Sequence, residues 1–287
     1  MALKHFVLGG KNIAYSDTGS GSETVILLHC SGSSHRIFKH IIESLSEQFR
    51  VLAPDLAGYG ASEAWSENES FHYQYDIDLV QRLIALCRTP VHIIGYSYGG
   101  LLALEVAPGC DALRSMLLME PAALQILRES DHSRLDREVE TVGARVVKSA
   151  KARQMRRAAA TYMSYWGGYW RWLLMSRDAK NRVQNTVHKA AMEFESVFSE
   201  ASHLDYYRKV SCPVMLVGGN QTRDAAKAII QILEQTLPKV ETRWLKGASH
   251  LTLLRQTNIR EIIDQWLLKV SNITTPRTEK AVENATV

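Results

Sequence analysis

The chain has 287 residues, of which 46% are hydrophobic and 22% are charged, and its formal net charge is +4. This composition is ordinary for a globular protein, and so small a charge gives no reason to expect a nucleic-acid or membrane-surface partner. Because no apolar run approaches the roughly 18 residues of a membrane span, and the N-terminal MALKHFVLGGKN lacks the apolar core of a secretory signal, we expect a soluble, cytoplasmic protein without stable membrane insertion.

Strand-like and helix-like segments alternate between residues 1 and 121. The segments HFVLGG and KNIAYSDTG predict a β-hairpin around Gly9-Gly10. Apolar residues at helical spacing, such as Ile37, Ile41 and Leu45, predict helices between the strands that follow. These further strands are predicted at 25–30, 50–55, 91–95 and 113–121, and the helices at 35–49, 73–87 and 101–107.

The pattern changes after residue 121. Residues 122–209 contain no clear strand and are helix-like, whereas 212–219 and 240–247 resume the strand pattern with a helix after each. Strands that alternate with helices predict an α/β fold, a mostly parallel sheet with helices on both faces. We therefore expect a core domain of residues 1–121 and 210–272, an inserted helical cap of residues 122–209, and a disordered tail of residues 273–287, which has few apolar residues.

Ligands of such sheets bind at the carboxyl ends of the strands, so the residues that follow each strand are candidates for chemistry. The clearest candidate is GYSYG at 95–99, between a predicted strand and the helix LLALEVA. It fits the G-x-S-x-G nucleophile elbow, in which small neighbours let a serine occupy a strained strand-to-helix turn. The alternative is a tight turn without chemistry, but the strand and helix on either side favour Ser97 as a nucleophile.

A serine nucleophile needs a base and a place for the oxyanion. His250 ends GASH, a loop beyond the last predicted strand, and the chain order serine, acid, histidine fits this elbow. The loop HCSGSS after the strand at 25–30 can offer one backbone N–H to an oxyanion hole, for which we choose Ser31. The second N–H would come from Tyr98, the residue after the nucleophile. The alternative for HCSGSS is a Gly/Ser-rich turn without chemistry.

With these three segments, the chain resembles the α/β-hydrolase superfamily over about residues 3–270. PDLAGYGAS at 54–62 is similar to the superfamily's D-x-x-G-x-G-x-S loop, which implies a structural role for Asp55. The resemblance implies the α/β-hydrolase fold with an inserted helical cap, and a Ser-His-acid catalytic triad. The first loop departs from the superfamily's usual H-G-x-x-G, because Cys30 follows His29.

The acid of this triad is open between several carboxylates. Many members of the superfamily carry it after the strand that is PVMLVGG here, but this chain has GNQT at 219–222 and only later Asp224. A variation of the family places the acid one strand earlier, where LLMEP contains Glu120, and LLMEP, SYWGGYW and VGGNQTRDAAKAI together look like a subgroup of small hydrolases. We favour Glu120, with Asp224, Asp205 or no acid at all as alternatives. Without a catalytic role, Glu120 would be a salt-bridging or capping carboxylate at a strand end.

Two features of the predicted cap have no assigned role. Residues 145–157 contain six basic residues and no acidic one, which indicates either a surface for anionic substrates or lipid headgroups, or a solvated helix face. Six tyrosines and tryptophans lie between positions 162 and 172, where they would either line a substrate pocket or pack the cap against the core. Between them, Gly167-Gly168 predicts a break between two helices.

These residues predict a serine hydrolase that cleaves an ester, lactone or related acyl bond of a small to medium apolar substrate through an acyl-enzyme. Ser97 would attack, His250 would move the proton and Glu120 would orient His250. The same residues also fit a carbon–carbon bond hydrolase or a lyase, and the fold fits a non-catalytic ligand-binding receptor. The four cysteines form no CxxC pair, and we expect no metal and no organic cofactor. The oligomeric state is open.

Overall fold

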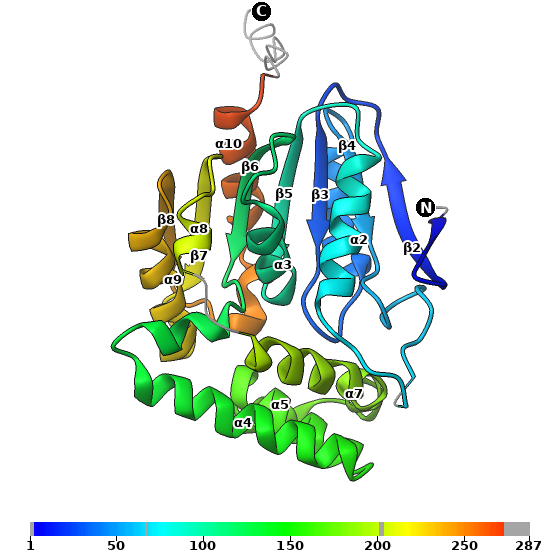
Figure 1. Ribbon diagram of the computed structural model, residues 1–287, viewed down its shortest axis with the longest axis vertical. Helices are drawn as coiled ribbons and strands as arrows, with labels where there is room; N and C mark the ends of the chain where they lie inside the picture. The colour runs from blue at the N-terminus through cyan, green and yellow to red at the C-terminus, as the bar shows by residue number, and fades with distance from the viewer. Residues whose placement is uncertain (1–2, 67, 201–203, 273–287) are drawn as a thin grey trace, which may run out of the picture.

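An eight-stranded sheet runs through the computed structural model, which describes residues 3–66, 68–200 and 204–272 (Figure 1). The tail of 273–287, predicted to be disordered, lies outside the described residues. The strand order is β1-β2-β4-β3-β5-β6-β7-β8. Neighbouring strands from β4 to β8 are parallel, whereas β2 runs antiparallel to both of its neighbours. The strands are β1 Leu3–Leu8, β2 Lys11–Thr18, β3 Thr24–Leu28, β4 Arg50–Pro54, β5 Val91–Tyr96, β6 Leu113–Met119, β7 Val214–Gly219 and β8 Val240–Leu245.

Helices cover the sheet and one of its ends. No helix in the described part of the chain is both long and apolar enough to cross a membrane. The α-helices are α1 Lys39–Leu45, α2 Gln74–Ala85, α3 Tyr98–Val106, α4 Ser133–Lys151, α5 Met155–Gly167, α6 Tyr169–Leu174, α7 Arg177–Ser199, α8 Leu204–Tyr207, α9 Asp224–Thr236 and α10 Ile259–Val270. Short 3-10 helices in the described residues are η1 His35–Phe38, η2 Leu124–Glu129 and η3 His250–Arg255.

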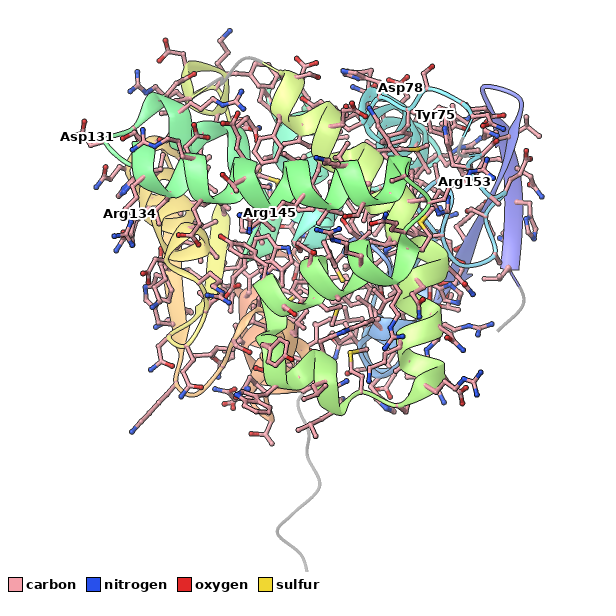
Figure 2. All side chains as sticks on the ribbon, turned by 90° about the horizontal axis from the view of Figure 1, so that it is seen from below. Tyr75, Asp78, Asp131, Arg134, Arg145 and Arg153 are labelled. Carbon is pink, nitrogen blue, oxygen red and sulfur yellow. The ribbon has the colours of Figure 1, made fainter. Side chains whose placement is uncertain are left out.

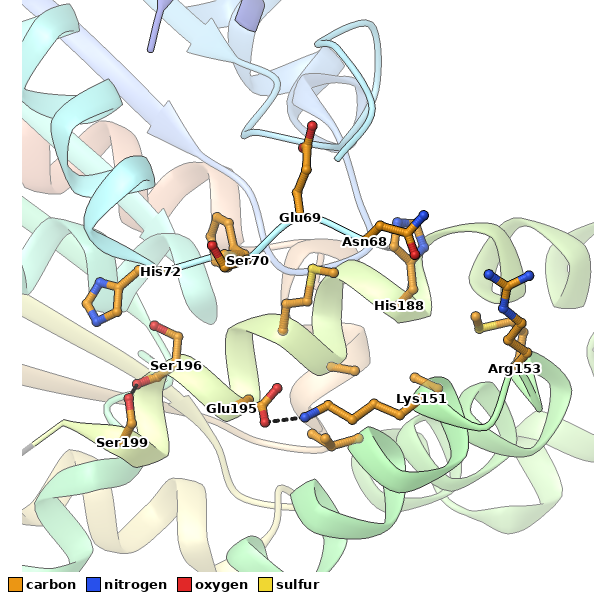
Figure 3. A pocket seen from close by; sticks show the side chains of 16 residues that line it. Asn68, Glu69, Ser70, His72, Lys151, Arg153, His188, Glu195, Ser196 and Ser199 are labelled. Atoms are coloured by element: carbon orange, nitrogen blue, oxygen red, sulfur yellow. Dashed lines mark hydrogen bonds and ion pairs between the residues drawn. The ribbon is translucent and has the colours of Figure 1, made fainter. Parts of the chain in front are cut away.

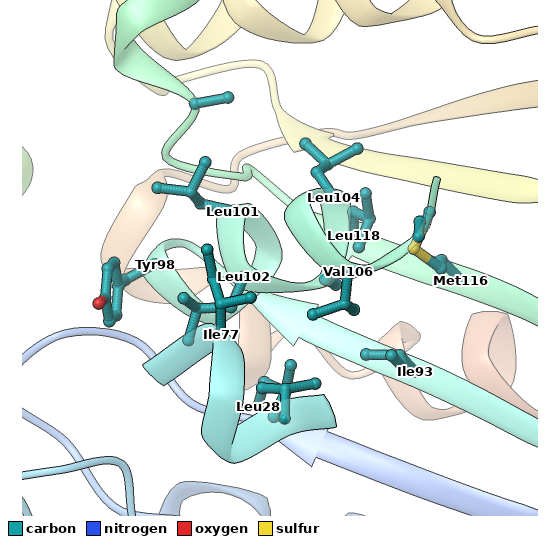
Figure 4. Packing of buried hydrophobic residues seen from close by; sticks show 14 of the residues in the cluster. Leu28, Ile77, Ile93, Tyr98, Leu101, Leu102, Leu104, Val106, Met116 and Leu118 are labelled. Carbon is teal, nitrogen blue, oxygen red and sulfur yellow. The ribbon is translucent and has the colours of Figure 1, made fainter. Parts of the chain in front are cut away.

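Buried hydrophobic side chains pack against both faces of the sheet. On one face, α2, α3 and α9 pack against the strands, and Leu102 of α3 and Met116 of β6 belong to the same buried cluster (Figure 4). On the other face, α1 and α10 pack against the opposite side of the same strands, as Ile42 and Trp266 show. Every residue of α3 is buried, including its one charged residue, Glu105, as expected for a helix that is apolar on nearly all sides. This burial holds the residue before α3, Ser97, in a fixed position.

Helices α4, α5, α6 and α7 form a separate layer across the carboxyl ends of the parallel strands (Figure 1). Buried apolar side chains such as Val146, Ala159 and Val187 hold α4, α5 and α7 to one another. The predicted break between two helices is confirmed, because α5 ends at Gly167 and Gly168 takes a φ of +86° before α6 begins. This layer, the α4–α7 layer, covers the edge of the sheet where the sequence places the candidate residues.

The helix predicted at 35–49 is wrong at both ends. Residues 35–38 form the 3-10 helix η1, and the α-helix that follows ends at Leu45. A reason is that His35 is tied to the sheet: its backbone N–H donates to Asp55 Oδ1 at 2.7 Å, and its ring Nδ1 lies 2.8 Å from the same oxygen. Helical spacing of apolar residues carries no information on such a contact.

Candidate active site

Ser97 occupies a strained turn between β5 and α3. Its φ of 55° and ψ of −115° lie outside the regions that L-residues ordinarily occupy, and such a conformation persists only where the surrounding structure enforces it. The glycines around it allow the turn to form. A Cβ at Gly99 would lie 2.2 Å from the carbonyl oxygen of Leu28, and one at Gly95 would lie 2.6 Å from the carbonyl oxygen of Gly99. Ser97 therefore has the strand-to-helix position that the motif predicts.

Ser97, His250 and Glu120 form one chain of hydrogen bonds. The Ser97 Oγ lies 3.1 Å from His250 Nε2, and His250 Nδ1 lies 2.7 Å from Glu120 Oε2. All three side chains are buried. Since an ionised carboxylate can only accept hydrogen bonds, the proton of the neutral imidazole belongs on Nδ1, which leaves Nε2 free to accept the serine proton. Ser97 follows β5 directly, Glu120 follows β6 directly, and His250 begins η3 beyond β8, so the three meet at the carboxyl edge of the sheet.

Glu120 is held by the loop after the neighbouring strand β7. The backbone N–H of Gly219 donates to Glu120 Oε1 at 2.8 Å, and the hydroxyl of Thr222 donates to Oε2 at 2.7 Å. These donors belong to GNQT, the segment in which many members of the superfamily carry the acid. Glu120 itself has a φ of +42°, an uncommon value for a residue other than glycine. The sequence analysis did not identify Thr222 as a partner, although its place in this segment was the available signal.

The alternative acids lie away from the histidine. Asp224 is at the start of α9, its side chain is 73% exposed, and it pairs with Lys227. Asp205 is 89% exposed and pairs with Arg208. Of the carboxylates considered from the sequence, the structure places only Glu120 against His250.

Aromatic rings hold His250 on two sides. The ring of Trp166 lies 4.5 Å from the imidazole between centroids, and that of Tyr96 lies 5.6 Å away. The hydroxyl of Tyr96 donates to the backbone carbonyl of His250. Ser249, just before the histidine, forms a capping box with Thr252 that begins η3. The imidazole is thus fixed both by its own backbone and by its neighbours.

The residues chosen for the oxyanion lie beside Ser97. Ser31, Ser97 and Tyr98 line the same small cavity, which has a volume of about 30 Å³. The loop that carries Ser31 is fixed through His29, whose Nδ1 lies 2.9 Å from the carbonyl of Cys30 and whose Nε2 accepts from the backbone N–H of Leu56 at 2.9 Å. Cys30 therefore does not prevent the loop from reaching the nucleophile.

Asp55 joins the segments that surround this loop. One of its oxygens binds His35, and the other accepts from the backbone N–H of Ala61 at 2.8 Å. Burial alone would raise the pKa of Asp55, but the hydrogen bonds from His35 and Ala61 outweigh it and hold the pKa below its ordinary value. A Cβ at Gly60 would lie 2.2 Å from the Asp55 carboxylate, which accounts for a glycine at this position of the loop.

The aromatic residues of the α4–α7 layer divide between the two roles considered. Tyr162 and Trp166 line the cavity beside Ser97, and Trp172 packs within the layer. Tyr169 and Trp170 face solvent, with exposed fractions of 61% and 70%. Two further cavity residues, Phe194 and Glu193 of α7, were not identified from the sequence, because a helical pattern does not say which layer a face packs against.

The basic residues at 145–157 lie at the surface. All six are exposed, and Arg145 and Arg153 lie along the outer side of the α4–α7 layer (Figure 2). This placement fits the solvated helix face. Two of the six, Lys151 and Arg153, border a second cavity of about 580 Å³ together with Glu195 and His72 (Figure 3). None of Ser97, His250 and Glu120 lines this larger cavity.

Comparison with known proteins places the chain in a family. A family model described as the alpha/beta hydrolase family matches residues 25–263. A magnesium-chelatase 30 kDa subunit of Rhodobacter capsulatus is 38% identical over 92 residues, which are 32% of this chain and 32% of that protein. A pimeloyl-acyl-carrier protein methyl ester esterase of Edwardsiella ictaluri is 32% identical over 90 residues, which are 31% of this chain and 32% of that protein. The match thus spans about a third of the length of these curated relatives.

Solved structures extend the likeness to the whole fold. The enol-lactonase from Burkholderia xenovorans LB400 has a TM-score of 0.71 at 17% identity, over 92% of this chain and 100% of that one. MenH from S. aureus has a TM-score of 0.73 at 15% identity, over 91% of this chain and 99% of that one. At these identities the likeness shows the fold alone. Since the family model covers most of the described chain and the sheet has the same architecture, the protein belongs to the alpha/beta hydrolase family.

Proposed function

We propose that the protein is a serine hydrolase that cleaves an ester, lactone or related acyl bond of a small to medium, largely apolar substrate. The observation that carries the proposal is the hydrogen-bond chain from Ser97 through His250 to Glu120, which ends beside a mostly apolar cavity. Further support comes from relatives, because one is named as a methyl ester esterase and one structural neighbour as an enol-lactonase.

In the proposed reaction, His250 Nε2 takes the proton of Ser97 as Oγ attacks the substrate carbonyl. The backbone N–H groups of Ser31 and Tyr98 would stabilise the oxyanion, helped by the N-terminus of α3, which begins at Tyr98. His250 then passes the proton to the leaving group, and water releases the acyl group from Ser97 by the same steps in reverse order. Glu120 would keep His250 in the required tautomer and stabilise its charged form.

We further propose that residues 122–209 act as a cap on a core made of residues 1–121 and 210–272. Tyr162, Trp166 and Glu193 of this segment line the cavity beside Ser97, so the segment would determine which acyl groups fit. The small size of the cavity favours short acyl chains next to the reacting carbonyl.

Labelling with a fluorophosphonate probe tests the nucleophile. The wild-type protein should be labelled once, and Ser97→Ala should not be labelled. Ser31→Ala is a matched control, because it removes a neighbouring hydroxyl but keeps the backbone N–H that the mechanism uses. Folded protein that remains unlabelled at Ser97 would favour a non-catalytic binding protein.

Rapid mixing with 4-nitrophenyl acetate separates acyl transfer from the other chemistries of this fold. Acyl transfer predicts a burst of 4-nitrophenol equal to the concentration of active sites, followed by slower turnover. A lyase that uses Ser97 only as a base, or a carbon–carbon bond hydrolase without an acyl-enzyme, predicts no burst.

A further inference from the structure

One carboxylate in the cavity beside Ser97 has no part in the mechanism above. Glu193, on α7, lines this cavity and is 3% exposed. Of the described residues that line the cavity, Glu193 is the one with a carboxyl group, and most of the others are apolar. A buried carboxylate is unfavourable unless its oxygens are hydrogen-bonded, so its partners show whether the fold accounts for it.

The two oxygens of Glu193 differ in their partners. Oε1 accepts a hydrogen bond from Lys189 Nζ at 2.9 Å. Oε2 is buried and has no hydrogen-bond partner within the residues that the structure describes. The hydroxyls of Ser31 and Tyr59 lie near the Glu193 carboxyl, but neither donates a hydrogen bond to Oε2. Oε2 therefore keeps an unused acceptor in a residue that lines the cavity beside Ser97.

Lys189 does not explain the presence of Glu193, because Lys189 already has a carboxylate partner. Its ammonium lies 3.2 Å from Asp76 Oδ2 and 3.5 Å from the centroid of the Phe71 ring, and its side chain is fully buried. Asp76 is in turn satisfied by the Tyr98 hydroxyl at 2.9 Å and the Ala57 backbone N–H at 3.1 Å. With Asp76 ionised, Lys189 and Asp76 balance in charge, and Glu193 adds a second acid to this buried pair.

The surroundings of Glu193 change the pKa of its carboxyl group. Burial raises the pKa of Glu193 above its ordinary value, and the carboxylate of Asp76 adds to this effect, while Lys189 opposes it. A hydrogen-bond donor on a bound substrate would lower the cost of burying the Glu193 carboxylate, because it would supply the partner that Oε2 lacks.

We propose that Glu193 is a specificity-determining residue, whose free Oε2 accepts a hydrogen bond from a hydroxyl or ammonium group on the acyl part of the substrate. The inference rests on the proposed acyl transfer at Ser97 and narrows its substrate class to short acyl groups that carry a hydrogen-bond donor. The rest of the cavity wall, including Ala190, Phe194 and Val197, contacts the apolar part of the acyl group.

A matched series of ethyl esters tests this inference. The esters are ethyl butanoate, ethyl 2-hydroxybutanoate, ethyl 3-hydroxybutanoate and ethyl 3-aminobutanoate, with hydrolysis followed by titration of the released acid. For the wild-type enzyme, kcat/KM of at least one donor-bearing ester should exceed that of ethyl butanoate by about tenfold or more, as expected for a hydrogen bond to a charged group. In Glu193→Ala this ratio should fall to about one. The preferred ester identifies the donor as hydroxyl or ammonium.

Two further variants keep the test decisive. Glu193→Gln keeps the size of the side chain and serves as the test variant if Glu193→Ala does not fold. Because the amide carries no charge, Glu193→Gln should in particular lose any preference for the amino ester. Glu195→Gln changes a carboxylate two positions along α7 that pairs with Lys151 at 2.5 Å and borders the other cavity (Figure 3). Glu195→Gln should leave all four rates as in the wild type.

Several results would overturn the inference. One is a wild-type kcat/KM for every donor-bearing ester that is about equal to that for ethyl butanoate. Another is a preference for a donor-bearing ester that persists in Glu193→Ala. A third is an equal loss of kcat/KM for all four esters in Glu193→Ala, which would mean that Glu193 only supports Lys189. Failure of the proposed function has a different signature, since the wild-type protein would then hydrolyse none of the esters and Ser97 would remain unlabelled by the fluorophosphonate.

Discussion

Replacement of Glu120 by glutamine separates the role of the acid's charge from that of its shape. Glu120 accepts from Gly219 N–H at Oε1, and from the Thr222 hydroxyl and His250 at Oε2. A glutamine has only one acceptor oxygen. If its NH₂ group takes the place of Oε2, His250 must present an unprotonated Nδ1, and Nε2 then carries the proton and cannot act as a base.

The opposite orientation of the glutamine is also unfavourable. With the amide oxygen toward His250, the NH₂ group faces the backbone N–H of Gly219, and two buried donors then meet. Leaving such groups unsatisfied costs about 1–3 kcal/mol, so the first orientation is favoured and the wrong tautomer predominates. Loss of a triad acid can reduce the rate by about 10⁴. We therefore expect Glu120→Gln to lower kcat/KM by about 10²- to 10⁴-fold, which corresponds to about 2.7–5.5 kcal/mol of transition-state stabilisation.

The measurement is the hydrolysis of a 4-nitrophenyl ester by Glu120→Gln and by Asp224→Asn, with thermal unfolding of each variant as the control for folding. Asp224 is exposed at the start of α9, so Asp224→Asn should change kcat/KM by less than about threefold, as for a surface substitution. A mild effect of Glu120→Gln together with a large loss in Asp224→Asn would refute the assignment of the acid.

Three other substitutions have expected outcomes. Thr222→Val removes one hydrogen bond to Glu120 Oε2 and should lower kcat/KM by about tenfold, the usual effect of losing a hydrogen bond to a charged group; an unchanged kcat/KM would contradict this. Gly99→Ala places a Cβ 2.2 Å from the Leu28 carbonyl oxygen and should lower the melting temperature by several degrees, as overpacking costs about 1–3 kcal/mol; calorimetry checks this. The hydrogen bond from Arg50 lowers the pKa of Asp17 in the folded protein. The ionised Asp17 therefore stabilises the fold fully at a pH above its pKa in the unfolded chain, about 3.9, and this stabilisation is lost as the pH falls through its lower pKa in the folded protein. Asp17→Asn should therefore destabilise the protein more at pH 7 than at pH 3 in urea titrations, and equal losses at the two pH values would argue against the ion pair.

The sequence predicts most of the sheet because the signals for it are local. The segment 91–101 contains a buried strand, a glycine-rich turn and a helix in immediate succession, so both β5 and the position of Ser97 follow from neighbouring residues. The cavity beside Ser97 is different. Tyr162, Trp166 and Glu193 reach it from α5 and α7, and their orientation depends on how two helices pack against each other and against the sheet. Amphipathic spacing identifies such helices but does not identify the partner of each face.

The position of the acid shows the same distinction at the level of single residues. The absence of a carboxylate from GNQT at 219–222 indicates only that the acid lies elsewhere, and several carboxylates remain open. The structure adds that Gly219 and Thr222 of this segment donate to the carboxylate of Glu120. A buried carboxylate at the end of β6 needs hydrogen-bond donors in addition to His250, because a buried charge is unfavourable without them. A small hydroxyl residue after β7 supplies one, whereas an aspartate there would repel Glu120. We therefore expect Glu120 and Thr222 to be energetically coupled, which a double-mutant cycle of Glu120→Gln and Thr222→Val checks: additive losses in kcat/KM would show that the two positions are independent.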